Sequence, residues 1–360
     1  MKASVAAKIL LWCALCVLVI LGFGEANAIS RFNRASLRYT TPISGQAAYR
    51  ARLHSIANAE QDTFWPTFWH ESKVNLSVGT RDAQSNAILF SGDAGLVWPA
   101  EFIAGSAPSV IDARGVAVSE PLAYRLWGST NIIGMPVHTN EEPRIVRGVF
   151  AGAAELVLIS FHIEDTSQIW TAVELAGGPP HPTRNNAEQF AMASGLGKPD
   201  YVQMGGAVAL ARLMAFFPIF IHAAYGLVLT IRFIRKYYRV ATTPVIFAGL
   251  ILSALMLPFL LNALPPWLIP THWSDFSFWG QLYRQGSHSL REFLSAPPML
   301  KDVEIKIHLL RQIGISFFAI CCSIGCMNIT TGNLASSAIP DRMEAGDTAD
   351  ILSARRAQRL

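Results

Sequence analysis

The residues of this sequence that could do chemistry are few and scattered. His70 and Glu71 are adjacent, but no third candidate metal ligand follows at a suitable spacing. Cys321 and Cys322 lie in an apolar run without a nearby histidine or carboxylate, so buried thiols that act as small hydrophobic groups are a better interpretation than a redox or metal site. The nine histidines are dispersed. No grouping of these residues predicts a catalytic centre.

The short motifs of nucleotide and hydrolytic chemistry are also missing from the sequence. Gly195-Leu196-Gly197-Lys198 is followed by Pro199, which cannot supply the hydroxyl that a P-loop uses to hold magnesium. There is no H-E-x-x-H, no G-x-S-x-G and no paired C-x-x-C set. We therefore expect a protein that is not an enzyme, holds no cofactor or metal, and takes the energy for any movement from a partner.

Two polar features remain as candidate functional sites. His222 lies inside an apolar run, where an ionisable group is costly and is a functional candidate by default, although a hydrogen bond to a neighbouring helix is the plainer explanation. Directly after this run comes the strongest positive cluster of the chain, which indicates a cytoplasmic loop. Its basic and aromatic members are Arg232, Arg235, Lys236, Tyr237, Tyr238 and Arg239.

The composition indicates the environment in which these residues work. Hydrophobic residues make up 51% of the chain and charged residues 15%, against about 25% charged in an average soluble domain. The mean hydropathy is +0.32. This deficit of charge indicates a membrane protein, and a net charge of +4 is too small to predict a nucleic-acid partner. All five cysteines lie in apolar segments, so a disulfide framework is not expected.

Four apolar runs are candidate transmembrane helices. The first can be read as a signal peptide that ends at Ala26-Asn27-Ala28, or as a retained helix. The basic cluster after the second run places that loop in the cytoplasm, so the long polar segment before it lies outside. Both termini are then cytoplasmic. The four runs are Ile9 to Gly24, Val208 to Ile231, Val245 to Leu264 and Ile313 to Met327.

The most informative part of the outer segment runs from Gly115 to Phe150. A short strand precedes Ser119, which stands at a helix N-cap, with Glu120 and Pro121 favourable in the first turn. Glycine ends this short helix at Gly128, and two further strands follow, over Met135–Thr139 and Arg144–Phe150. The apolar residues at helical spacing are Leu122, Ala123, Leu126 and Trp127, so one face of this helix is apolar. We expect Leu122, Leu126 and Trp127 to face the core.

This unit resembles the periplasmic core domain of MacB-like and FtsX-like ABC transporter permeases. The matching motifs are a strand that ends in Ser-Glu, a Leu-Ala-x-x-Leu-Trp-Gly helix, a Gly-x-x-Val strand and a Val-x-Gly-Val strand, with a Phe-x-x-Gly stretch upstream. Here they are Gly115 to Glu120, Leu122 to Gly128, Gly134 to Val137, Val146 to Val149 and Phe102 to Gly105. The resemblance is specific over roughly residues 82–150 and weaker elsewhere.

The resemblance implies a permease subunit that pairs with a second permease, identical or related, on two separate cytoplasmic ATPases, which bind the ATP. It implies that ATPase motion is relayed to the outer domain for export, extraction or signalling. The basic cluster is a candidate ATPase contact, and the alternative is that it only anchors the helix by the positive-inside rule. Members of the family carry an Arg-Arg-x-Glu-Ile-Gly pattern in this loop, whereas residues 232–243 contain no Glu and no Gly. The alternative is therefore a membrane-anchored binding or regulatory protein that has lost ATPase coupling.

The expected fold is an α+β extracytoplasmic domain inserted between a first transmembrane helix and a three-helix transmembrane bundle. Aromatic residues at 267–283 are more consistent with a belt at the membrane interface than with a substrate cage. The predicted segments are a helix or signal peptide (1–29), the core domain (30–204), helices at 205–234, 243–264 and 311–331, a basic loop (235–242), an external aromatic-rich loop (265–310) and a cytoplasmic tail (332–360).

Overall fold

The computed structural model describes residues 2–32, 34–59, 63–140, 142–179, 183–237, 247, 276–295 and 299–336. The chain divides into two units. One is an α+β unit of Asn27–Ala209 and Pro270–His308, and the other is a helical unit of Met1–Ala26, Leu210–Ile269 and Leu309–Leu360. Each unit is described by itself.

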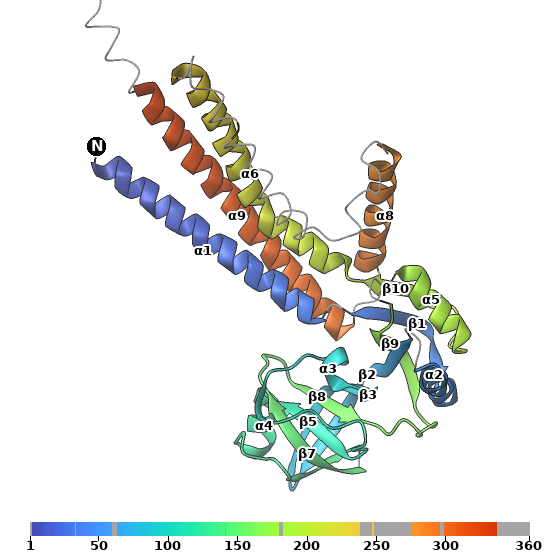
Figure 1. Ribbon diagram of the computed structural model, residues 1–360. Helices are drawn as coiled ribbons and strands as arrows, with labels where there is room; N and C mark the ends of the chain where they lie inside the picture. Colours follow the sequence, from blue (N-terminus) through green and yellow to red (C-terminus); the bar gives the residue numbers. More distant parts are fainter. Residues whose placement is uncertain are drawn as a thin grey trace, which may run out of the picture. The chain divides into compact units, whose positions relative to one another are not determined.

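The α+β unit is built on one ten-stranded sheet (Figure 1). The strand order is β10-β1-β9-β2-β3-β8-β5-β7-β4, and β6 pairs with both β2 and β7. The strands are β1 (Ala35–Ser44), β2 (Phe64–Val78), β3 (Arg81–Ser91), β4 (Phe102–Gly105), β5 (Gly115–Ser119), β6 (Pro136–Thr139), β7 (Glu142–Phe150), β8 (Leu156–Ser160), β9 (Ile169–Gly177) and β10 (Tyr201–Met204). The helices packed with them are α2 (Gly45–Ala57), α3 (Ala94–Val97), α4 (Glu120–Trp127) and α5 (Arg184–Ala193). Helix α8 (Phe276–Ser295) belongs to the same unit.

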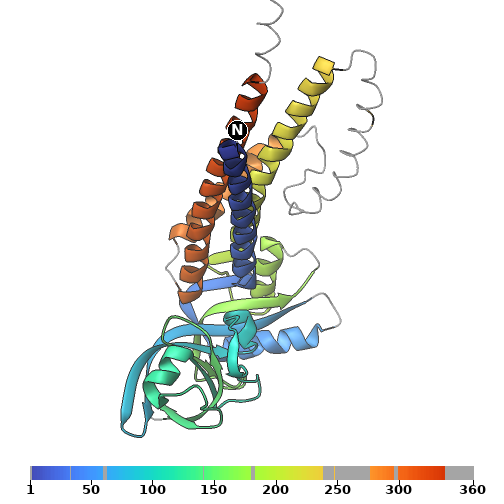
Figure 2. The same ribbon diagram turned by 90° about the vertical axis from the view of Figure 1, so that its left-hand side faces the viewer.

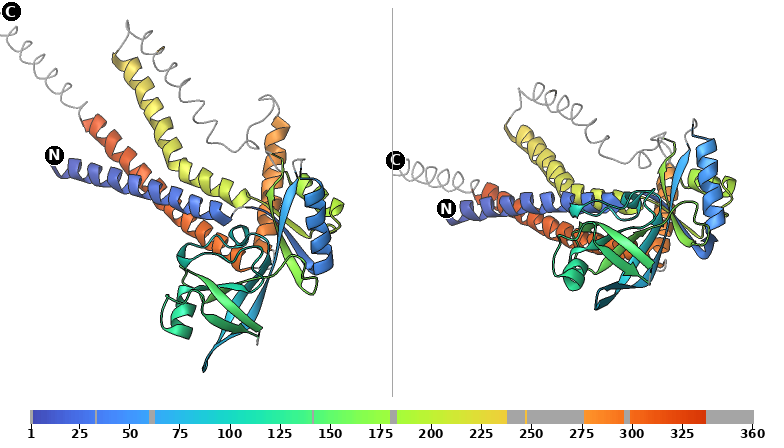
Figure 3. Two further views of the ribbon diagram at one scale, coloured as in Figure 1. Left: turned by 60° about the horizontal axis from the view of Figure 1, so that its bottom comes forward. Right: turned by 90° about the horizontal axis from the view of Figure 1, so that it is seen from below.

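Half of this sheet closes on itself. Because β6 pairs with β2 at Leu76 and Ser77 and with β7 along its other edge, the path β2-β3-β8-β5-β7-β6 returns to β2. Figure 3 shows these strands from two further directions. Helix α4 contributes Leu122, Ala123 and Leu126 to the core of this half, where they pack with inward-facing valines of the strands. The closed half therefore has a core of its own.

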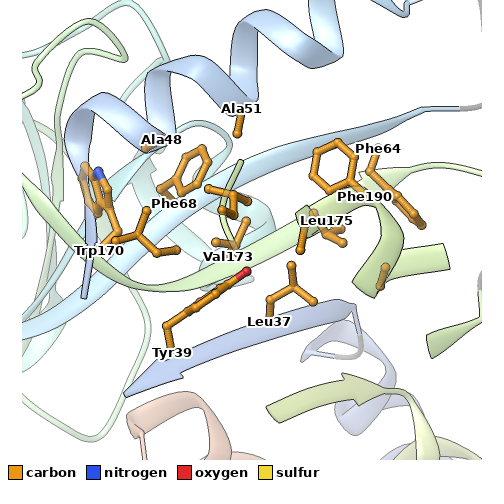
Figure 4. Packing of buried hydrophobic residues seen from close by; sticks show 14 of the residues in the cluster. Leu37, Tyr39, Ala48, Ala51, Phe64, Phe68, Trp170, Val173, Leu175 and Phe190 are labelled. Carbon is orange, nitrogen blue, oxygen red and sulfur yellow. The ribbon is translucent and has the colours of Figure 1, made fainter. Parts of the chain in front are cut away.

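The other half of the sheet is open and carries two helices on one face. Phe190 of α5 stacks edge-on against Phe64 of β2, with ring centroids 5.6 Å apart, and Ala48 and Ala51 of α2 join the same cluster (Figure 4). The alternation of side chains along a strand places Leu37, Phe68 and Val173 on this face. The residues next to these in each strand point to the opposite face of the sheet.

The stretch from Gly115 to Phe150 folds as the predicted strand, helix, strand and strand. Gly128 ends α4 in the left-handed conformation, with φ 76°. At Gly148 of β7, a Cβ atom would come within 2.4 Å of the Ser106 carbonyl oxygen and 2.6 Å of the Phe102 ring, so this position also requires glycine. Ser119 is the N-cap residue of α4, as predicted, but its hydroxyl accepts the Leu156 N–H and makes no capping hydrogen bond. Trp127, which was expected to face the core, is only half-buried.

The helical unit contains parts of three long helices, which Figure 2 shows lengthwise. Three stretches of the described residues are long and apolar enough to cross a membrane: Ile9–Phe32, Gly206–Gly226 and Leu300–Asn328. They belong to α1 (Lys2–Phe32), α6 (Gly206–Tyr237) and α9 (Leu300–Ser336). The predicted span from Val245 to Leu264 lies outside the described residues, apart from Phe247.

These observations confirm the predicted fold class at the level of a mixed α+β domain between an N-terminal apolar helix and later apolar helices. The predicted aromatic-rich loop differs in form from the prediction. Its described part from Phe276 to Ser295 is the helix α8, and α9 begins at Leu300, before the predicted start of the last span at residue 311.

Candidate functional site

The predicted basic cluster lies at the end of α6. The helix continues through Tyr237, so Arg232, Arg235, Lys236 and Tyr237 are helical, whereas Tyr238 and Arg239 lie outside the described residues. This arrangement is compatible with an extended helical end that carries the basic residues, and the role of the cluster stays a prediction.

His222 is packed within the helical unit. Its Nδ1 lies 3.0 Å from the Pro218 carbonyl oxygen one turn earlier in the same helix, and its ring contacts that of Trp12 of α1 at a centroid distance of 4.9 Å. The histidine thus meets a neighbouring helix through an aromatic contact, and its described hydrogen bond stays within α6. A role in transport for His222 stays a prediction.

Pro218 frees a backbone carbonyl of α6, and a side chain of α9 donates a hydrogen bond to it. Proline has no N–H, so the Met214 carbonyl, four residues earlier, has no partner in its own helix. The Ser316 hydroxyl of α9 donates to this carbonyl over 3.2 Å, and the Gln312 amide donates to Ser316 over 3.1 Å. These two hydrogen bonds connect α6 and α9, and side-chain hydrogen bonds of this kind stabilise the packing of apolar helices.

The most concentrated polar feature of the α+β unit was not predicted. Glu174, in the middle of β9, is fully buried. Its Oε1 accepts three hydrogen bonds, from Ser36 Oγ at 2.8 Å, Trp69 Nε1 at 3.1 Å and an Arg38 nitrogen at 3.3 Å. Its Oε2 lies 2.9 Å from Lys301 Nζ. We call Ser36, Arg38, Trp69, Glu174, Lys301 and Asp302 the charge cluster.

Strand register explains how these distant residues meet. Ser36 of β1 lies directly opposite Glu174, while Arg38 of β1 and Trp69 of β2 both lie opposite Ala172. Residues two apart in a strand share a face, so all of them project from the same side of the open half of the sheet. This is the face opposite to the one that α2 and α5 cover.

The first turn of α9 completes the cluster. Lys301 has a side chain that is 1% exposed, and it also donates to the Leu96 carbonyl oxygen at 2.9 Å. Asp302 accepts from Arg38 at 3.2 Å, and the Arg38 guanidinium lies 4.7 Å from the centroid of the Trp69 ring. Two acidic and two basic side chains therefore alternate, and each has an opposite charge as neighbour. Removal of Lys301 would leave the buried Glu174 with only one of its two cations, Arg38.

Glu71 fixes the start of α9 from the same face of β2. Its Oε1 accepts the Leu300 N–H at 2.6 Å, which satisfies one of the free N–H groups at the start of the helix. Burial raises the pKa of the Glu71 carboxyl from 4.5 to about 7, against the opposing effect of the backbone N–H of Leu300 and the charge of Arg38. Glu71 therefore titrates near neutral pH at this contact.

His70 and Glu71 do not act together, although they are adjacent. Neighbours in a strand point to opposite faces, and the His70 ring packs against Trp170, 5.6 Å between centroids, on the face away from the charge cluster. Burial lowers the pKa of His70. Within the described part of the chain, no group of three His, Cys, Asp or Glu residues could hold a metal ion.

The chemistry available at the charge cluster is electrostatic. Its charged groups form ion pairs with one another, although the buried Arg38 Nε has no hydrogen-bond partner among the described residues. These ion pairs hold the first turn of α9 against strands β1, β9 and β2. Trp69 is fully buried beside the charged groups, whereas Trp65 is 37% exposed. One signal in the sequence pointed to this site: Glu174 is a lone acid in an apolar strand, and such a residue needs a buried partner.

Comparisons with known proteins were made at three levels. No family model matches the chain, and no curated protein matches its sequence. Solved structures do match. The extracellular domain of the noncanonic ABC-type transporter YknZ from Gram-positive bacteria is 12% identical with a TM-score of 0.37, and the match covers 48% of this chain and 98% of that one.

Two further matches are of the same kind. The periplasmic region of MacB from Actinobacillus actinomycetemcomitans is 11% identical with a TM-score of 0.40, covering 49% of this chain and 90% of that one. A domain of a putative permease protein from Porphyromonas gingivalis is 15% identical with a TM-score of 0.32, covering 46% of this chain and 83% of that one. In this chain the α+β unit stands between apolar helices in the sequence.

Proposed function

We propose that this chain is a transmembrane permease subunit of an ABC transporter of the MacB/FtsX type, which relays the motion of a separate cytoplasmic ATPase to its extracytoplasmic domain. The proposal rests first on the motif unit from Gly115 to Phe150, which folds in the order and with the glycine positions that the resemblance implies. It rests second on the way in which the apolar helices join the sheet.

The observation that carries the proposal is that three candidate spans reach three adjacent strands. Helix α1 ends at Phe32 and β1 begins at Ala35, while β10 ends at Met204 and α6 begins at Gly206. β1 and β10 pair with each other, and β9 is the next strand of the sheet. The charge cluster ties the start of α9 to β1 and β9. A displacement of any of these helices would be delivered to the same edge of the domain.

In this function the chain needs no catalytic centre of its own. ATP would be bound by the partner ATPase, and a second permease subunit would complete the transporter. Export, extraction and signalling are all compatible with such a relay. The residues proposed to contact the ATPase are those at the end of α6 and just beyond it.

The test is purification of the full chain in mild detergent from the cells that make it. We expect an ATPase with a P-loop to co-purify in a fixed ratio. Tyr237→Ala with Tyr238→Ala should reduce its recovery, because the two aromatic side chains are lost while the basic residues that set topology remain. Ile351→Ala with Leu352→Ala is the matched control and should retain the ATPase. Recovery of the intact chain without any ABC ATPase would refute the proposal.

One observation favours a second candidate function. The segment from Arg232 to Thr243 lacks the glutamate and glycine of the pattern that docks on the ATPase in the family. A membrane-anchored binding or regulatory protein would keep the domain and its helices without that contact. The same purification separates the two functions, because this protein would be recovered without an ATPase.

A further inference from the structure

Helix α8 carries an unusual exposed stripe of large apolar side chains. Trp279, Tyr283, Leu290 and Leu294 are 45%, 77%, 41% and 60% exposed. Their spacings of four, seven and four residues place them within roughly 60° of one another around a helix of 3.6 residues per turn. The stripe therefore forms a continuous line along one side of α8.

The opposite side of α8 is the one that contacts the domain. Glu292 lies about half a turn away from the stripe, and it forms an ion pair of 3.1 Å with Arg184 of α5. His288, on the same polar side, lies 3.5 Å from Glu292. An amphipathic helix of a soluble domain buries its apolar face and exposes its polar face. Helix α8 instead leaves its apolar stripe exposed, so this face is adapted to another apolar medium.

The chemistry of the stripe suits the edge of a bilayer. Tryptophan and tyrosine concentrate at the membrane–water interface, where an apolar ring meets hydrated headgroups. Arg284 and Arg291 are exposed on the flank between the stripe and the polar side, where they can reach lipid phosphates. The candidate span that starts at Leu300 follows α8 after only four intervening residues, so the chain itself keeps α8 near a membrane.

We propose that α8 lies in the outer membrane–water interface, with Trp279, Tyr283, Leu290 and Leu294 among the lipids. The Arg184–Glu292 ion pair then connects this lipid-bound helix to α5, which packs beside β10. The α+β unit is thereby attached to the membrane surface in addition to its connections through α1, α6 and α9. This inference does not depend on coupling to an ATPase.

The experiment places spin labels on the two sides of α8 in the full chain. The five native cysteines are replaced by alanine, and Leu290→Cys and His288→Cys are labelled separately in nanodiscs of phosphatidylcholine and phosphatidylglycerol. Collision rates with oxygen, which partitions into lipid, and with a water-soluble nickel chelate are measured. We expect the oxygen-to-nickel ratio to be several-fold higher at residue 290 than at residue 288.

Two results would overturn the proposal. Equal ratios at both positions would place the stripe in water, and a label at residue 290 that neither reagent reaches would place it against protein, such as a second copy of the chain. Leu294→Cys is the second variant on the stripe, for use if Leu290→Cys does not elute as a folded protein in gel filtration. Arg284→Cys should have a ratio between those of residues 290 and 288.

Discussion

Replacement of Lys301 by methionine tests whether the charge cluster holds the start of α9. Methionine keeps an unbranched stem of similar length but removes the ammonium group. Glu174 would retain its three donors to Oε1 and would lose the cation 2.9 Å from Oε2. Removal of one partner from a buried ion pair costs on the order of 3–5 kcal/mol. Because about 1.4 kcal/mol is a factor of ten, the first turn of α9 should open roughly a hundredfold to several thousandfold more often.

Hydrogen exchange of the full chain in detergent, followed by mass spectrometry of peptides that cover residues 299–308, measures this opening. Lys198→Met is the matched control, because Lys198 is exposed and a surface change should stay within about 0.5 kcal/mol. Lys301→Met combined with Glu174→Gln should recover part of the protection, because the buried carboxylate that has lost its second cation is then replaced by a neutral amide. If Lys301→Met exchanges like the control, or if the two substitutions add without coupling, the cluster does not hold α9.

Three further predictions concern other contacts. Burial raises the pKa of Glu71 from 4.5 to about 7, so its contribution to the free energy of unfolding is present below pH 4.5 and is lost as the pH rises to about 7. The loss should be about 3 kcal/mol. The resulting fall in the melting temperature should disappear in Glu71→Gln, and its persistence would contradict the assignment. Gly128→Val should destabilise the chain by about 1–2 kcal/mol because φ is 76°, whereas Gly128→Asn, which tolerates this conformation, should cost less than half as much in thermal melts. The segment Ile9 to Gly24 should be retained in the mature protein, since Ala26 to Ala28 lie inside α1 and Ile29 is fully buried; an intact mass that starts at Ile29 would contradict this.

The motif unit could be predicted from sequence because its signals are local. Strand, helix and glycine positions between Gly115 and Phe150 are set by residues close in the chain, and the structure has them in that order. The burial of Trp127 was overestimated for the same reason. Helical spacing places Trp127 on the apolar side of α4, but only the tertiary packing decides that it stays half-buried at the edge of the core.

The charge cluster could not be predicted because its members are far apart in sequence. Ser36 and Glu174 are separated by 138 residues, and Arg38 and Asp302 by 264. Their meeting depends on the register of β1 against β9 and on where α9 returns to the sheet, and no local pattern encodes either. A lone acid in an apolar strand, such as Glu174, indicates a buried partner but does not identify it.

Part of the description of α8 could be predicted from the sequence. The aromatic density of residues 276–283 predicted a membrane interface, and the helical spacing of Trp279, Tyr283, Leu290 and Leu294 was also present in the sequence. The side of α8 that contacts α5 could not be predicted, because the Arg184–Glu292 ion pair joins residues that are 108 positions apart.

The pairing of β1 with β10 bears on how proteins of this kind can diversify. Ala35 lies opposite Met204, so the chain enters and leaves the domain through two neighbouring strands. A domain inserted in this way can be replaced as a unit between the same two helices. The charge cluster limits this exchange. A grafted domain would bring its own counterparts of Arg38 and Glu174, while Lys301 and Asp302 would remain with the host. Recombination between relatives is therefore expected to succeed only where these two halves of the cluster match in charge.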